Sequence, residues 1–311
     1  MFFKKEISVN IKSNGLYAPL DELIEQKKYL PYIKQRHNNI TSDQSGDIRS
    51  AFKGRGMEFE EVRLYGFGDD VRDIDWRVTA RHGNTYTKVF SEEKDREVYV
   101  VLDLSPYMVF GTKKELKSVS ASKLAAILGW QSVVNKDRFG LLLYDGVDTR
   151  LFKPQNNQKS LMAILKNISQ TSKSILDKPS AEIEKSNISD PLKYLQYSIK
   201  SRAVVFVISD FKNTTDDAYK ALVALTKKCK VYCLNVYDYI EEVPPESGEY
   251  AAQYGKDELK FDTSPLIFKE AYFQYFAKKR KIIEGFCKKF GCQYIGIRTD
   301  KPLYKQLKIF G

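Results

Sequence analysis

Two near-continuous apolar runs mark the middle of this chain, at residues 98–104 (VYVVLDL) and 203–209 (AVVFVIS). Runs of this kind are typical of parallel strands that are buried on both faces. Shorter apolar runs predict further strands at 138–144, 231–236 and 293–297. Apolar residues at helical spacing predict helices at 115–135, 160–168, 190–199, 216–228 and 268–290. Strands that alternate with helices over this length predict a doubly wound, mostly parallel α/β sheet with right-handed crossovers.

Weaker patterns surround this sheet. Residues 85–91 alternate as a strand does, residues 149–152 predict a short edge strand, and the turn-rich segment 248–262 predicts a hairpin. The long helix at 268–290 carries the aromatic residues Tyr272, Phe273, Tyr275 and Phe276. An aromatic stripe at helical spacing is typical of a core-facing surface, so we expect these rings to be buried. Residues 19–33 predict a short helix that ends at Pro31, and 37–47 a flexible turn.

The stretch 54–81 differs from the rest of the chain in its charges. It contains five Arg and no Lys, together with seven carboxylates, whereas Lys dominates elsewhere. The planar guanidinium of Arg pairs with carboxylates in a fixed geometry. We therefore expect Arg63, Arg72 or Arg77 to pair with one of the nearby acids, Asp69, Asp70, Asp73 or Asp75. The alternative is a solvated polar loop between two elements.

Within this stretch the order of residues resembles the hallmark of the family called domain of unknown function 58. The matching positions are Glu58-Phe59, Arg63-x-Tyr65, Gly68-Asp69-Asp70-x-Arg72-x-Ile74-Asp75-Trp76 and Ala80-Arg81. In that family the hallmark leads into a von Willebrand factor A-like domain, and the sequence from Val98 onward is similar to one. The resemblance implies three parts: an N-terminal leader (1–53), the hallmark segment (54–97) and a von Willebrand A-like α/β domain (98–311).

The resemblance also implies a function. Members of the family are similar to non-enzymatic interaction proteins that bind MoxR-type AAA+ ATPases and other von Willebrand A-like proteins, in protein assembly, maturation or stress response. Hallmark residues with an implied structural or interaction role are Arg63, Tyr65, Asp69, Asp70, Arg72, Asp75, Trp76 and Arg81.

Two of the predicted strands end in an aspartate, Asp103 and Asp210, and ligands of open α/β sheets bind at the carboxyl ends of strands. Both positions resemble corners of the metal-ion-dependent adhesion site, which begins Asp-x-Ser-x-Ser and holds Mg²⁺ through hard oxygen ligands. The resemblance carries over Asp103, Ser105 and Asp210, with Ser189 as a stand-in for a third-loop threonine. It fails at Tyr107, which replaces the second serine. We therefore expect a degenerate site that binds Mg²⁺ weakly.

Two alternatives to a metal site remain open. An aspartate after a strand commonly caps the next turn or helix. The site could also have lost its metal, with Tyr107 filling the pocket and Asp103 bonded to backbone amides.

Charge and motif content bear on other functions. The formal net charge of +11 raises a basic nucleic-acid-binding protein as the alternative function. The lysines are spread along the chain and no standard nucleic-acid motif is present, so we expect no nucleic-acid partner. A metal-dependent hydrolase is less favoured, because the hallmark acids are interleaved with Arg. With no Ser-His-Asp order and no phosphate-binding glycine loop, we expect the protein not to be an enzyme.

The four cysteines and the hydropathy of the chain indicate the state of the thiols and the location of the protein. Cys229 and Cys233 lie roughly 13 Å apart on one strand face, too far for a disulfide. Cys287 and Cys292 lack the spacing of zinc ligands, so we expect buried, reduced thiols. No apolar stretch approaches the roughly 20 residues of a membrane span, which predicts a soluble, cytoplasmic protein.

Overall fold

The computed structural model describes residues 2–3, 15–33, 57–92, 96–177, 187–199, 202–254 and 257–307. The chain divides into two compact units, one of residues 1–37 and 96–311 and the other of residues 38–95. The turn predicted over 37–47 and residues 54–56 of the hallmark stretch lie outside the described residues.

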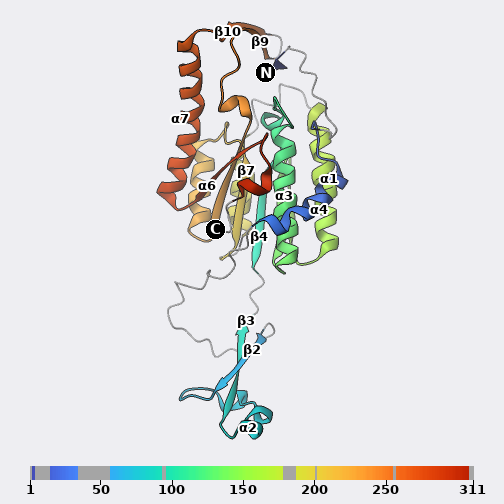
Figure 1. Cartoon of the computed structure of the whole chain (residues 1–311), viewed down its shortest axis with the longest axis vertical. Coiled ribbons are helices and arrows are strands. Elements are labelled where there is room, and N and C mark those ends of the chain that lie inside the picture. The colour runs from blue at the N-terminus through green and yellow to red at the C-terminus, as the bar shows by residue number, and fades with distance from the viewer. Residues whose placement is uncertain are drawn as a thin grey trace. The chain divides into compact units, whose positions relative to one another are not determined.

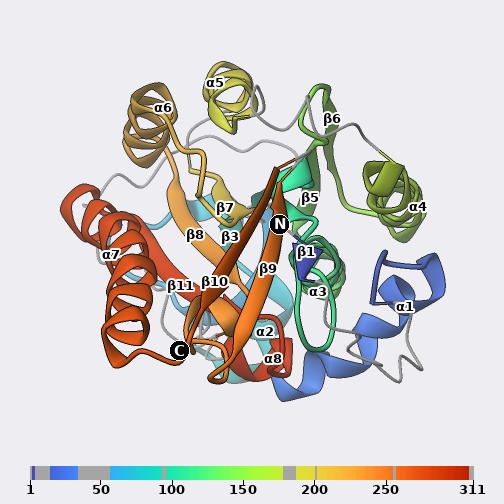
Figure 2. The same ribbon diagram turned by 90° about the horizontal axis from the view of Figure 1, so that it is seen from above.

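A six-stranded sheet forms the centre of the larger unit (Figure 2). Its order is β11 (Gln293–Arg298), β8 (Lys230–Tyr237), β7 (Val204–Ser209), β4 (Glu97–Asp103), β5 (Arg138–Tyr144) and β6 (Thr149–Gln155). All neighbours pair in parallel except β6, which runs antiparallel at the edge. The near-continuous apolar runs at 98–104 and 203–209 form the adjacent strands β4 and β7. The prediction of a mostly parallel sheet is confirmed.

Helices cover both faces of this sheet (Figure 2). One face carries α1 (Leu20–Glu25), α3 (Lys117–Val134) and α4 (Gln158–Ser174), and the other carries α5 (Ser189–Ser198), α6 (Asp216–Thr226) and α7 (Leu266–Phe290). Alternate side chains of each central strand enter the two cores. On β4, for example, Val100 belongs to the first core and Val101 to the second. This explains why the central strands are apolar at nearly every position.

The helix α3 is buried along most of its length. Gly129 lets α4 approach closely, because a Cβ at this position would lie 2.6 Å from Cδ1 of Leu161. The indole N–H of Trp130 donates to the backbone carbonyl of Leu23 in α1 at 3.2 Å. These contacts tie three helices into one core.

The N-terminal segment belongs to the same core. After α1 the chain continues as a 3-10 helix, η1 (Gln26–Tyr32), which contains Pro31 rather than ending at it. Leu23, Leu30 and Ile33 are buried against the helices of the first face. Tyr29 of η1 also stacks on Tyr304 of the C-terminal helix α8 (Leu303–Gln306), with ring centroids 4.9 Å apart.

The predicted hairpin is confirmed as β9 (Glu249–Tyr254) and β10 (Asp257–Asp262), and β1 (Phe2–Phe3) pairs with its first strand. The aromatic stripe of α7 behaves differently from the prediction. Phe273 and Tyr275 are more than half exposed, so the expectation that they are core residues is wrong. The fully buried residues of α7 are Ile283 and Cys287, because the helix packs on the sheet through its C-terminal half.

The smaller unit is built on an antiparallel pair, β2 (Met57–Leu64) and β3 (Tyr86–Glu92), joined through the 3-10 turn η2 (Val71–Asp73) and the helix α2 (Trp76–His82) (Figure 1). The strand β3 was predicted, whereas β2 was not. Across the described parts of both units, every helix is too short or too polar to cross a membrane.

Candidate functional site

The strand ends of β4 and β7 bring the two predicted aspartates together. Asp103 is the last residue of β4, Asp210 directly follows β7, and Leu102 pairs in register with Ile208. Asp103, Ser105, Tyr107 and Asp210 line a common cavity of about 10 Å³, which has room for roughly one water molecule. The prediction that the two aspartates lie side by side at this edge is confirmed.

Asp103 is buried, and its two carboxylate oxygens already accept hydrogen bonds. The backbone N–H of Ser105 donates to Oδ1 at 2.9 Å, and the hydroxyl of Ser209 donates to Oδ2 at 2.6 Å. Burial raises the pKa of Asp103; the Ser209 hydrogen bond counteracts this, while the neighbouring Asp210 carboxylate adds to it. The carboxylate is therefore held in place by the protein's own donors.

Asp210 is paired with a lysine that the sequence did not single out. The ammonium of Lys117, the first residue of α3, lies 2.5 Å from Oδ2 of Asp210 and 3.6 Å from Oε1 of Glu241. Lys212 contacts the same Glu241 oxygen. We call these four residues, Lys117, Asp210, Lys212 and Glu241, the buried ion cluster. It sets two cations against two carboxylates beside the cavity.

The pKa values in the buried ion cluster follow from this pairing. Burial lowers the pKa of Lys117 and is the largest single effect, but Asp210 and Glu241 together outweigh it, so the pKa is raised overall. For Glu241 burial acts upward, yet Lys117 and Lys212 hold its pKa at about 2, below the ordinary 4.5. Both side chains therefore stay charged in the folded protein at neutral pH.

The fourth predicted ligand, Ser189, does not line the cavity. Its hydroxyl donates to the side-chain carbonyl of Asn187 and lies 2.9 Å from the hydroxyl of Thr215, the N-cap residue of α6. Asn187 lines the cavity in its place. The sequence offered little signal for either Lys117 or Asn187, whereas Glu241 closes a capping box with Asp238 that its spacing could have revealed.

The donor set around the cavity fits a Mg²⁺ site poorly. Mg²⁺ requires six oxygens in near-octahedral geometry. Here the Asp103 oxygens are hydrogen-bonded, Asp210 is neutralised by an ammonium, and Ser189 points elsewhere. Magnesium binding stays a prediction, and the described contacts favour the alternative of a site without metal.

In the smaller unit, the expected Arg–carboxylate pairs are confirmed. Arg63 lies 2.7 Å from Asp69, which also accepts from the backbone N–H of Gly66 at 2.8 Å. The phenol of Tyr65 donates to the backbone carbonyl of Asp69 at 3.0 Å. These bonds close the turn that follows β2.

Two further hallmark acids cap short helices. Asp70 accepts from the backbone N–H of Arg72 and pairs with its guanidinium at 3.0 Å. Asp75 accepts from the backbone N–H groups of Arg77 and Val78 at the start of α2, and the bond to Val78 is the main reason that its pKa is lowered. Asp69, Asp70 and Asp75 thus each fix a local stretch of backbone.

The same contacts leave large side chains exposed on this unit. Trp76 is 67% exposed, and the side chain of Arg72 is 80% exposed although it is paired. Arg81 is exposed in the last turn of α2, which ends at Gly83 with a φ of 76°. A left-handed residue at this position is a common helix end, and glycine adopts it without strain.

The fold and these contacts define an α/β protein with a central, mostly parallel sheet. Its smaller unit contains several Arg residues and has short helices that are capped by aspartates. Residues 61–281 match the family described as "Protein of unknown function DUF58", and the chain belongs to this family.

The chain is similar to several other bacterial proteins in sequence or in structure. Uncharacterized proteins of Mycobacterium bovis and Mycobacterium tuberculosis are 24% identical over 274 residues, which cover 86% of this chain and 82% of each relative. A conserved hypothetical protein BatB from Bacteroides thetaiotaomicron is similar in structure with a TM-score of 0.41 and 20% identity, covering 69% of this chain and 95% of that one. An aerotolerance-related membrane protein from Bacteroides fragilis has a TM-score of 0.39 and 18% identity, covering 68% and 94%.

Proposed function

We propose that this member of the family is a non-enzymatic protein-interaction module whose larger unit is a von Willebrand A-like domain. The observation that carries the proposal is that the two aspartates at the ends of β4 and β7 already have partners within the protein. Asp103 and Asp210 are held by Ser105, Ser209 and Lys117, and the cavity beside them is about the size of one water molecule. General acid–base or metal catalysis needs a group within reach of a bound substrate. A small cavity with paired carboxylates suits a structural or recognition role better.

The proposed partner is a MoxR-type AAA+ ATPase, as the family resemblance implies, and the proposed place of action is the cytoplasm. The docking surface is the exposed part of the smaller unit around Trp76, Arg72 and Arg81. Tryptophan and arginine side chains contribute most to binding at many protein interfaces. Caps at Asp70 and Asp75 hold these groups in fixed positions, which reduces the entropy lost on binding. The four cysteines are free thiols, in keeping with a reducing compartment.

The test is co-purification of the full-length protein with an AAA+ ATPase from its native cells, identified by mass spectrometry and by ATP hydrolysis. Trp76→Ala should lose the ATPase while keeping the melting temperature. Tyr197→Ala is the matched control, because Tyr197 is also strongly exposed (83%) but lies on α5. Equal recovery of the ATPase with the two variants would contradict the proposal. Failure of the parent itself to recover an ATPase would also contradict it.

We further propose that the strand-end site works without Mg²⁺ and that the Lys117 ammonium supplies the positive charge beside Asp210. Millimolar Mg²⁺ should then leave the melting temperature of the parent unchanged, and Tyr107→Ser should not create a shift. Lys117→Met should make the site responsive, since Asp210 and Glu241 would then lack a cation that they contact in the parent. A rise in the parent's melting temperature with Mg²⁺ would contradict this proposal and support the weak metal site that the sequence predicts.

A further inference from the structure

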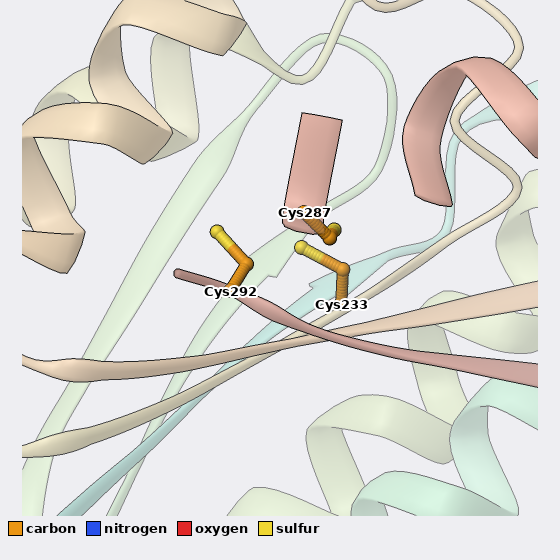
Figure 3. Close-up of side chains that lie close together, drawn as sticks. All are labelled: Cys233, Cys287 and Cys292. Carbon is orange, nitrogen blue, oxygen red and sulfur yellow. The ribbon is translucent and has the colours of Figure 1, made fainter. Parts of the chain in front are cut away.

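Three cysteines that are far apart in the sequence meet inside the second core. Cys233 lies on β8, Cys287 in the last turn of α7, and Cys292 directly before β11, and all three are buried (Figure 3). Their sulfur atoms lie within 4.8 Å of one another. We call them the thiol cluster. The spacing of the cysteines in the chain does not reveal the thiol cluster, because their meeting depends on how α7 returns to the sheet.

Three separate elements fix the positions of the thiol cluster. The strands β8 and β11 pair in parallel, with Cys233 opposite Tyr294. Gly291 ends α7 in the left-handed region at φ 77°, so the chain turns from the helix into β11 within two residues. Cys287 and Ile283, four residues apart, form the buried face of α7. The sulfurs are therefore brought together by the fold itself.

We propose that the thiol cluster is a binding site for one soft monovalent metal ion, Cu(I), held by the sulfurs of Cys233, Cys287 and Cys292. Three sulfurs that each lie about 2.3 Å from one ion are about 4 Å apart, which requires only a small contraction of the described arrangement. Thiolate ligands select soft ions such as Cu(I), zinc and iron–sulfur clusters. This assignment is independent of the proposed interaction with an ATPase.

The number of ligands distinguishes among these ions. Structural zinc sites and most iron–sulfur clusters have four protein ligands. Among the described residues the group of metal-binding side chains at this point contains the three cysteines and no fourth member. The three cysteines belong to the second hydrophobic core, whose other members include Val231 and Leu225. A three-coordinate ion fits this arrangement better than a four-coordinate one.

The test measures Cu(I) binding to the full-length reduced protein under anaerobic conditions, in competition with the chelator bathocuproine disulfonate. We expect one equivalent of Cu(I) per chain, with sulfur coordination by X-ray absorption spectroscopy. Cys233→Ser, Cys287→Ser and Cys292→Ser should each weaken binding by at least about tenfold, since even the loss of an outer partner of a metal ligand costs about 10–100-fold. Cys229→Ser is the matched control: Cys229 is also buried on this side of the sheet but is not a member of the cluster.

A second measurement keeps the test informative if a variant folds poorly. Because only the folded protein holds the three sulfurs together, Cu(I) should raise the melting temperature of the parent and of Cys229→Ser, and should raise that of Cys292→Ser less. The absence of Cu(I) uptake by the parent would overturn the proposal and leave three core thiols. Uptake that persists unchanged in all three cluster variants would also overturn it. Preferential, cluster-dependent uptake of Zn(II) would overturn the assignment to a three-coordinate monovalent ion.

Discussion

Ion pairs in this protein differ in burial, and burial determines how much each contributes. Lys117 and its partner Asp210 are almost completely shielded from water, whereas the Arg72–Asp70 pair faces solvent. An exposed pair gains little because water and salt screen it. A buried pair that loses one member leaves an uncompensated charge in the core, which is strongly unfavourable.

Lys117→Met should therefore destabilise the protein by about 3–5 kcal/mol, the usual cost of breaking a buried pair. Arg72→Lys should leave stability unchanged, although the sequence pattern alone suggested a structural role for its geometry. Urea unfolding of both variants measures the difference. If the Lys117→Met protein is as stable as the parent, loss of this ammonium does not leave a destabilising unpaired charge in the buried ion cluster.

Glu241 should make stability depend on pH in the acid range. Its pKa is about 2 in the folded protein against an ordinary value of 4.5, so its contribution is complete above about 4.5 and is lost as the pH falls toward 2. The shift corresponds to roughly 3 kcal/mol. Glu241→Gln should flatten this part of the stability curve measured by urea unfolding at several pH values. Equal acid slopes in parent and variant would contradict the pairing of Glu241 with Lys117 and Lys212.

At the scale of elements, close helix packing depends on Gly129. A methyl group there would meet Leu161 at 2.6 Å and the ring of Phe139 at 3.2 Å. Gly129→Ala should destabilise the protein by about 1–3 kcal/mol through overpacking. Gly285→Ala on α7 is the control, because no atom lies within 4 Å of its added Cβ. It should stabilise the protein by up to about 1 kcal/mol through helix propensity. Thermal unfolding of the pair tests whether α3 and α4 pack as described.

The sequence predicted elements best where burial was uniform. Strands β4 and β7 are buried on both faces, so their apolar runs were unambiguous. The strand β2 (MEFEEVRL) alternates apolar and charged residues, but the alternation changes phase at a register shift between Phe59 and Glu61, so the pattern alone did not reveal the strand. On α7 the aromatic spacing suggested a core face, yet the position of the helix on the sheet decides which part is covered.

The candidate sites show the same limit. Asp103 and Asp210 could be placed together because parallel strands end at one edge. Lys117, at the start of α3, could not be predicted, because no periodic sequence pattern marks a buried lysine. The thiol cluster was hidden for a related reason: its members are neighbours only after α7 and β11 are both in position.

At the scale of the whole molecule, the formal net charge of +11 bears on how strongly the protein binds DNA or RNA. We expect only non-specific association with DNA or RNA, weak at physiological salt, because the basic side chains are spread along the sequence. Filter binding at increasing salt concentration measures this. A nucleic-acid-binding surface with six to ten phosphate contacts would lose about 10³–10⁵ in affinity between 50 and 200 mM salt. Tight binding at low salt with a slope that steep would favour the nucleic-acid-binding alternative.

The stacking of Tyr29 on Tyr304 has a consequence for biosynthesis. A ribosome releases the segment around α1 and η1 long before it has made α8. Until then part of the apolar surface beside Leu30 and Ile33 lacks its final cover. Contacts between distant parts of a chain form slowly, and exposed apolar surface attracts chaperones. We therefore expect the nascent protein to depend on chaperones until α8 emerges.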